Sequence, residues 1–95
     1  MFVGVMQLQL ALTDNASLKD KRSVVKRVAH RIGNTFNVAV AEVDAQDRLD
    51  AAVLGVAAVS ASRPYIEGLL QKVESFVDRL GLGRLLDAPK SIEHY

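Results

Sequence analysis

Six of the fifteen residues from 17 to 31 are basic, and this is the densest grouping of chemically active side chains in the chain. The segment SLKDKRSVVKRVAHR holds six Lys and Arg side chains against one acid, Asp20, for a charge of +5. The whole chain carries +1, so the other eighty residues sum to −4. Lys and Arg neutralise phosphates and release the counterions that surround nucleic acid. The segment therefore indicates a surface that contacts an anionic partner.

A helix is the element that must position these cations. Ser17 is a typical N-cap, and Asp20 three residues later completes an acidic version of the capping box. The helix is predicted to run to about Ile32, where Gly33 and Asn34 are typical of a helix end. Its apolar residues share one face at a spacing of 3.6. They are Leu18, Val25, Val28, Ala29 and Ile32.

The basic residues of this helix are arranged against its local stability. Like charges at i,i+4, as in Arg22–Lys26 and Arg27–Arg31, cost about 0.2–0.5 kcal/mol each. Cations in the first turns oppose the helix dipole by about 0.3–1 kcal/mol each. We therefore predict phosphate contacts on the exposed side of the helix, whereas Lys21 turns toward the apolar face. The predicted nucleic-acid-binding residues are Lys19, Arg22, Lys26, Arg27 and Arg31.

The sequence allows two interpretations of the basic helix. It is an RNA-contacting surface, or it is a solvated face, since Lys and Arg are good helix formers. The usual RNA-binding signatures are missing: residues 51–61 carry no aromatic, there is no GXXG loop, and aromatics make up 5% of the chain. Phe36, Tyr65 and Phe76 fit core or helix-flank positions better than base stacking. This favours contact with the backbone of helical RNA or of a ribosomal particle.

The remaining elements follow from apolar periodicity. Residues 2–12 and 37–44 predict strands, and residues 51–61, apolar on both faces, predict a central strand. Ser62 and Pro64 open a second helix, which is amphipathic from Ile66 to Leu80 and ends at Gly81. Residues 84–95 hold a short last strand, which Pro89 confines to an edge or splits.

This order predicts a single α+β domain over residues 1–95. It is a ferredoxin-like βαββαβ sandwich, an antiparallel four-stranded sheet with two helices on one face. The other sheet face is left open and apolar, which usually indicates a partner. We expect a homo-oligomer that packs through this face. The predicted interface residues are Val3, Val5, Val53 and Val59.

An acidic corner lies in the range 42–50, with Arg48 among its four carboxylates. These are Glu42, Asp44, Asp47 and Asp50. It fits a hairpin with turn-forming Asp residues better than a divalent-ion site, since no pattern fixes ligand spacing. It could also pair with the basic helix of a neighbouring subunit. In that alternative the basic helix is a protein–protein or self-assembly surface.

Several functional classes are disfavoured by the sequence. There is no Cys, and the longest apolar run, 51–59, is shorter than the roughly 18 residues of a membrane span. The N-terminus lacks the basic region of a secretory signal, so we expect a cytoplasmic protein without a membrane partner. His30 and His94 lack an evident nucleophile, and Ser60 and Ser62 fit strand-end and cap roles. We predict no catalytic residues, metal ligands or cofactor; a small-ligand regulatory module rests on fold analogy alone.

The chain resembles a known family in four segments. VGVMQLQLAL, SLKDKRSVVKRV, FNVAVAEVDAQD and LGVAAVS are similar to the YlxP-like family of small bacterial proteins of unknown function. The resemblance runs from about Val3 to Leu80 and is weaker over the last twelve residues. It implies a ferredoxin-like α/β fold and a gene neighbourhood shared with translation initiation and ribosome maturation. It implies no catalytic residues.

Overall fold

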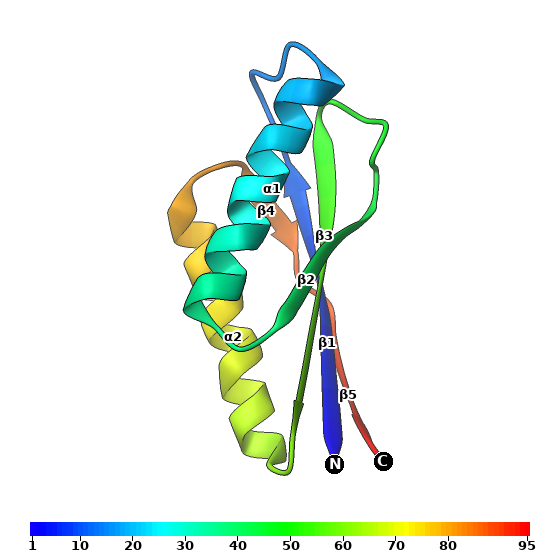
Figure 1. The fold of residues 1–95 in the computed structure, drawn as a ribbon, viewed down its shortest axis with the longest axis vertical. Helices are drawn as coiled ribbons and strands as arrows, with labels where there is room; N and C mark the ends of the chain where they lie inside the picture. Colours follow the sequence, from blue (N-terminus) through cyan, green and yellow to red (C-terminus); the bar gives the residue numbers. More distant parts are fainter.

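Two helices cover one face of an antiparallel sheet, and the other face of the sheet carries no helix (Figure 1). The computed structural model describes all residues from 1 to 95. The elements in chain order are β1 Phe2–Ala11, α1 Leu18–Thr35, β2 Ala39–Asp44, β3 Ala51–Ser60, α2 Arg63–Leu80, β4 Arg84–Asp87 and β5 Lys90–His94. The predicted strands and helices therefore all form, with small shifts in their ends.

The sheet has the order β2–β3–β1, with β4 and β5 both paired to the far edge of β1. β1 pairs with β3 over its whole length, from Phe2 opposite Ser60 to Ala11 opposite Ala51. The first and third strands are therefore central, and both crossovers pass through a helix. This is the predicted ferredoxin-like α+β sandwich.

The last strand is split in two around Pro89. β4 pairs with the upper part of β1 and β5 with its lower part, as between Val5 and Ser91. Proline has no N–H to donate, but the Pro89 carbonyl still accepts a hydrogen bond from the Gln7 N–H at 3.0 Å. Of the two predicted outcomes for Pro89, the structure shows the split. The sheet consequently has five strands in four positions.

The core lies between the sheet and the helices, as the alternation along β1 predicts. Met6, Leu8 and Leu10 are buried, and so is Leu12 just after the strand. The apolar stripes of both helices pack onto them. The helix residues of this cluster are Val25, Val28, Ile32, Ile66, Leu70, Val73 and Val77. Burial of both stripes on one sheet face fixes the directions of the helices.

The end of α1 differs from the prediction. The helix continues through Gly33 and Asn34 to Thr35, and Phe36 is its C-cap, with an N–H bond to the Ile32 carbonyl at 2.9 Å. A Gly inside a helix costs only about 1 kcal/mol relative to Ala. The ring of Phe36 packs edge-on against Phe76, with centroids 5.4 Å apart. This tertiary contact, rather than the local signal, determines where the helix stops, and β2 begins at residue 39 instead of 37.

The boundaries of α2 agree with the prediction. The Ser62 hydroxyl accepts a hydrogen bond from the Tyr65 N–H at 3.2 Å, and Pro64 lies in the first turn. At the other end, Gly81 has a φ of 65°, the left-handed conformation that Gly adopts without strain. Both ends of α2 are therefore determined by local sequence.

Candidate nucleic-acid interface

The basic helix begins where its cap predicts. The Ser17 hydroxyl accepts a hydrogen bond from the Asp20 N–H at 3.1 Å, so Leu18 is the first helical residue. This satisfies one of the backbone donors left free at a helix N-terminus. The cap thereby fixes the register that decides which cations face outward.

Lys21 is the one cation of this segment that points into the protein. It is fully buried, its ammonium lies 3.1 Å from a carboxylate oxygen of Glu42 in β2, and it donates a hydrogen bond to the Ala45 carbonyl. That oxygen of Glu42 is itself buried and accepts no hydrogen bond, so the ion pair is its polar contact. Lys21 therefore fastens the start of α1 to β2 and the following turn.

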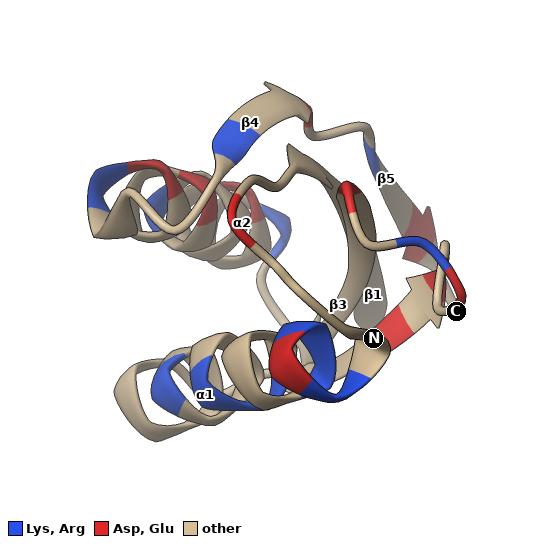
Figure 2. Cartoon of the chain, turned by 90° about the horizontal axis from the view of Figure 1, so that it is seen from above, with Lys and Arg blue, Asp and Glu red and all other residues tan.

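The five predicted nucleic-acid-binding residues are all exposed on α1, and none of them forms an ion pair. They are Lys19, Arg22, Lys26, Arg27 and Arg31. The ion pairs of the chain involve other cations: Lys21, Arg48, Arg63 and Lys90. Figure 2 shows basic residues along the length of α1. These five charges are thus available to an external anion.

The five cations divide into two rows along the helix. Lys19, Arg22 and Lys26 follow the flank nearer β2, where Lys26 and His30 line a shallow hollow with Val40. Arg27 and Arg31 follow the flank nearer α2. The guanidinium of Arg31 lies 5.8 Å from the ring centre of Phe76, within the range of a cation–π contact. The sequence did not indicate that one row reaches the second helix.

Three of the four carboxylates of the acidic corner make contacts within the same chain, whereas Asp47 makes no hydrogen bond or ion pair. Glu42 pairs with Lys21, Asp44 accepts a hydrogen bond from the Ala45 N–H at 2.7 Å, and Arg48 makes two hydrogen bonds of 3.0 Å to Asp50. The hydrogen bond from Arg48 holds the pKa of the exposed Asp50 carboxyl below its usual value. No group of three or more His, Asp or Glu side chains is placed to hold a metal ion. Glu42 is therefore unavailable to a neighbouring subunit.

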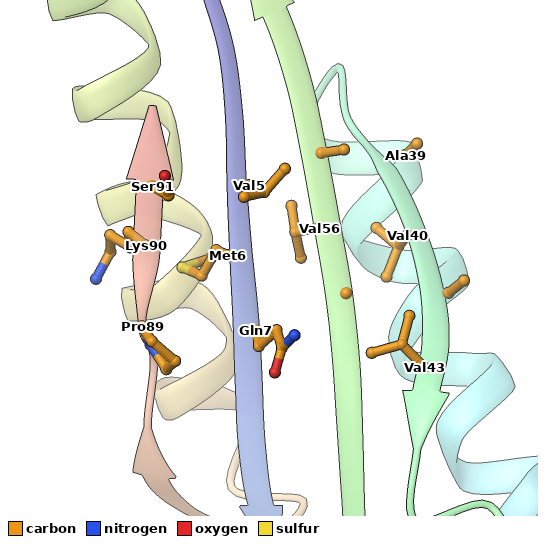
Figure 3. A pocket seen from close by; sticks show the side chains of 13 residues that line it. Val5, Met6, Gln7, Ala39, Val40, Val43, Val56, Pro89, Lys90 and Ser91 are labelled. Atoms are coloured by element: carbon orange, nitrogen blue, oxygen red, sulfur yellow. The ribbon is translucent and has the colours of Figure 1, made fainter. Parts of the chain in front are cut away.

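The open sheet face is a second candidate surface. Val5 and Val59 are 45% and 63% exposed, and Val3 and Val53 are half-buried on the same side. Figure 3 looks onto this face, with the helices behind the sheet. A shallow hollow of about 690 Å³ lies there, between the side chains of Val5, Gln7 and Val43 and the segment at Pro89. The predicted interface residues thus lie together on an exposed apolar surface.

Residues weighed for other chemistry have structural contacts. The ring of His94 stacks on Phe2 with centroids 4.3 Å apart, and the Ser60 hydroxyl accepts a hydrogen bond from the Ser62 N–H at 3.0 Å. Phe36 and Phe76 pack together at the helix layer, whereas Tyr65 is 54% exposed at the start of α2. Neither helix is long and apolar enough to cross a membrane.

The fold and the two surfaces define a small ferredoxin-like α+β protein with a cationic helix on one side and a bare sheet on the other. Comparison with known proteins identifies its family. Residues 3–89 match the family described as "Protein of unknown function (DUF503)", and the chain belongs to that family. It is also 41% identical over 76 residues to the "Uncharacterized protein YlxP" of Bacillus subtilis (strain 168), covering 80% of this chain and 83% of that protein. The predicted YlxP-like membership is therefore confirmed.

Proposed function

We propose that the protein is a non-enzymatic binding protein that contacts the phosphates of RNA, free or within a ribosomal particle, through helix α1. The observation that carries this proposal is the set of five exposed cations on α1, none of them in an ion pair. Helix α1 itself carries one acid against these cations, because Asp20 is its single carboxylate. The proposal requires the protein to be in the cytoplasm, where RNA and ribosomes are found.

The arrangement favours contact with the RNA backbone over reading of bases. The sheet face, which stacks bases in other ferredoxin-like RNA-binding domains, presents Val, Ala, Gly and Gln here and no aromatic side chain on β3. Arg and Lys on a rigid helix bind phosphates without regard to sequence and with strong salt dependence. Binding should therefore depend on RNA shape and ionic strength.

The experiment is a salt titration of binding to a labelled, folded fragment of ribosomal RNA. It compares the wild type with the variant Arg22→Glu/Lys26→Glu, which reverses two charges of α1. Each phosphate contact contributes about 0.7–0.9 to the slope of log K against log salt. We expect the variant to lose at least two contacts, so its slope should be shallower by about 1.4–1.8.

The matched control is Arg63→Glu/Arg84→Glu, which makes the same change in net charge away from α1. Both variants should keep the circular dichroism and melting temperature of the wild type within a few degrees, because all four residues are exposed. Equal losses in the two variants would show that only net charge matters. Absence of wild-type binding at low salt would refute the proposal.

A second proposal concerns the open sheet face, which we expect to pair with a second copy of the chain. The central strands β1 and β3 bring no charged side chain to this face, and charged residues in register with it, such as Arg84 and Glu93, lie on the edge strands β4 and β5. The molecule measures 43 by 21 by 21 Å, so its whole face covers about 900 Å². A standard stable interface buries about 800 Å² per partner. Sheet-to-sheet packing would therefore use most of this face.

A further inference from the structure

Helix α2 has no net charge, but its basic and acidic residues lie on different sides of the helix. In sequence, Arg63, Lys72 and Arg79 balance three acids. Lys72 lies four residues before Phe76 and Arg79 three residues after it, so at 3.6 residues per turn both lie on the same flank of the helix as Phe76. The acids are rotated to the other side of α2. They are Glu67, Glu74 and Asp78.

Ion pairs hold two of these acids away from α1. Glu74 pairs with Lys90 of β5, and Glu67 pairs with Arg63 at 3.1 Å. In Figure 2 the acidic segments of α2 lie on the side away from α1. Lys72 and Arg79 are both exposed and form no ion pair. The flank of α2 that faces α1 therefore carries cations without acids.

Phe76 joins this flank to the basic residues of α1. The guanidinium of Arg31 lies 5.8 Å from its ring centre, and the ring of Phe36 packs against it at 5.4 Å. Just beyond, a hollow of about 510 Å³ lies between the end of α1 and the start of α2, and Lys72 and Tyr65 line it. We call the surface between the two helices, which includes this hollow, the interhelical groove. By helical spacing, Arg27 and Arg31 of α1 and Lys72 and Arg79 of α2 lie on the flanks that face it.

We propose that the interhelical groove seats the phosphate backbone of an RNA double helix, and that Lys72 and Arg79 are phosphate-contacting residues. This inference rests on the proposed function and extends its site from one helix to two. A double helix is favoured over a single strand because Tyr65 is the one exposed aromatic of the groove, whereas single-strand binding relies on several stacked bases. Cations on both helices suit an A-form backbone, which proteins recognise largely by shape and phosphate contacts.

The test is fluorescence anisotropy of a labelled blunt-ended RNA duplex, titrated with protein at several salt concentrations. The variant Lys72→Gln/Arg79→Gln removes both α2 charges of the groove without reversing them. We expect the slope of log K against log salt to become shallower by about 1.4–1.8, since each lost phosphate contact removes about 0.7–0.9. The control Arg63→Gln/Arg84→Gln removes the same charge outside the groove and should keep the wild-type slope.

The outcomes separate the two proposals. If wild type binds, Arg22→Glu/Lys26→Glu shows the expected shallower slope and Lys72→Gln/Arg79→Gln behaves like its control, then α1 alone is the site and the interhelical groove is refuted. If the wild type binds neither duplex nor folded ribosomal RNA, the proposed function itself fails. Unlabelled duplex should displace the probe at lower concentration than a single strand of equal length and composition. The reverse order would overturn the assignment to double-helical RNA.

Discussion

Lys21 differs from the other cations of α1, because its charge is buried in the fold and theirs are at the surface. It lies in the same cationic run as Lys19 and Arg22, yet its ammonium is buried against Glu42 and the Ala45 carbonyl. Removing one partner of a buried ion pair leaves an uncompensated charge, which costs about 3–5 kcal/mol in a dry site. Because Glu42 keeps 15% of its side-chain exposure, the lower end of that range applies.

We therefore expect Lys21→Ala to lower the free energy of unfolding by about 3 kcal/mol. Lys21→Met/Glu42→Leu, which removes both charges and restores volume, should recover most of this loss. The measurement is urea denaturation followed by circular dichroism at neutral pH. Lys19→Ala is the control and should change stability by less than about 0.5 kcal/mol, because its side chain is exposed. A Lys21→Ala protein as stable as this control would mean that the ion pair contributes nothing.

For single residues, the sequence predicted which side chains are exposed but not which contacts they make. Helical spacing alone placed Lys19, Arg22, Lys26, Arg27 and Arg31 outside and turned Lys21 inward. It could not identify Glu42 as the partner, because that contact depends on how β2 is placed beside α1. Helical spacing places Lys72 and Glu74 on opposite sides of α2. Only the structure shows that the side with Lys72 is the one that faces α1.

At the scale of elements, Gly4 sets how closely α2 approaches β1. A Cβ added at Gly4 would lie 2.3 Å from a methyl carbon of Ile66, well inside van der Waals contact. Gly4→Ala should therefore destabilise the protein by about 1–3 kcal/mol, the usual cost of overpacking a core. Ile66→Ala removes this methyl carbon and so makes room at the same contact. We expect the double variant to lose less than the sum of the two single losses.

Thermal denaturation of the four proteins in this cycle measures the coupling. Gly33→Ala serves as the control, since no atom lies within 4 Å of a Cβ built there and the residue is inside α1. It should raise the melting temperature slightly, because Ala favours a helix more than Gly does. Strictly additive losses at Gly4 and Ile66 would contradict the close-packing argument.

The elements differ in how well local signals predict their ends. Ser17, Ser62 and Gly81 act through their own backbone and were readable from the sequence. Gly33 and Asn34 resemble a helix end but lie inside α1, because packing of Phe36 on Phe76 extends the helix. Pro89 predicted either an edge strand or a split strand, and only the pairing of both halves with β1 shows that the strand is split and that the halves share one position in the sheet.

At the scale of the whole molecule, the bare sheet predicts self-association. Val5→Lys/Val59→Lys places two charges on the exposed apolar face and should shift the protein from dimer to monomer in sedimentation velocity at micromolar concentration. Gln71→Lys/Ser75→Lys adds the same charge on α2 and should leave the dimer intact. Since Val5 and Val59 are already exposed in one chain, folding should survive the change. A monomeric wild type would refute the sheet-to-sheet dimer.

The central place of β1 has a consequence for the order in which the protein can form. Phe2 pairs with His94 and Met6 with Lys90, so β1 completes its pairing only with a strand that leaves the ribosome more than eighty residues later. Pairings between such distant residues slow folding, because a long loop must close before they form. Until residues 90–94 emerge, the lower half of β1 keeps an unpaired edge beside an apolar sheet face. During synthesis the nascent chain therefore passes through a stage that is open to strand addition from a neighbouring polypeptide.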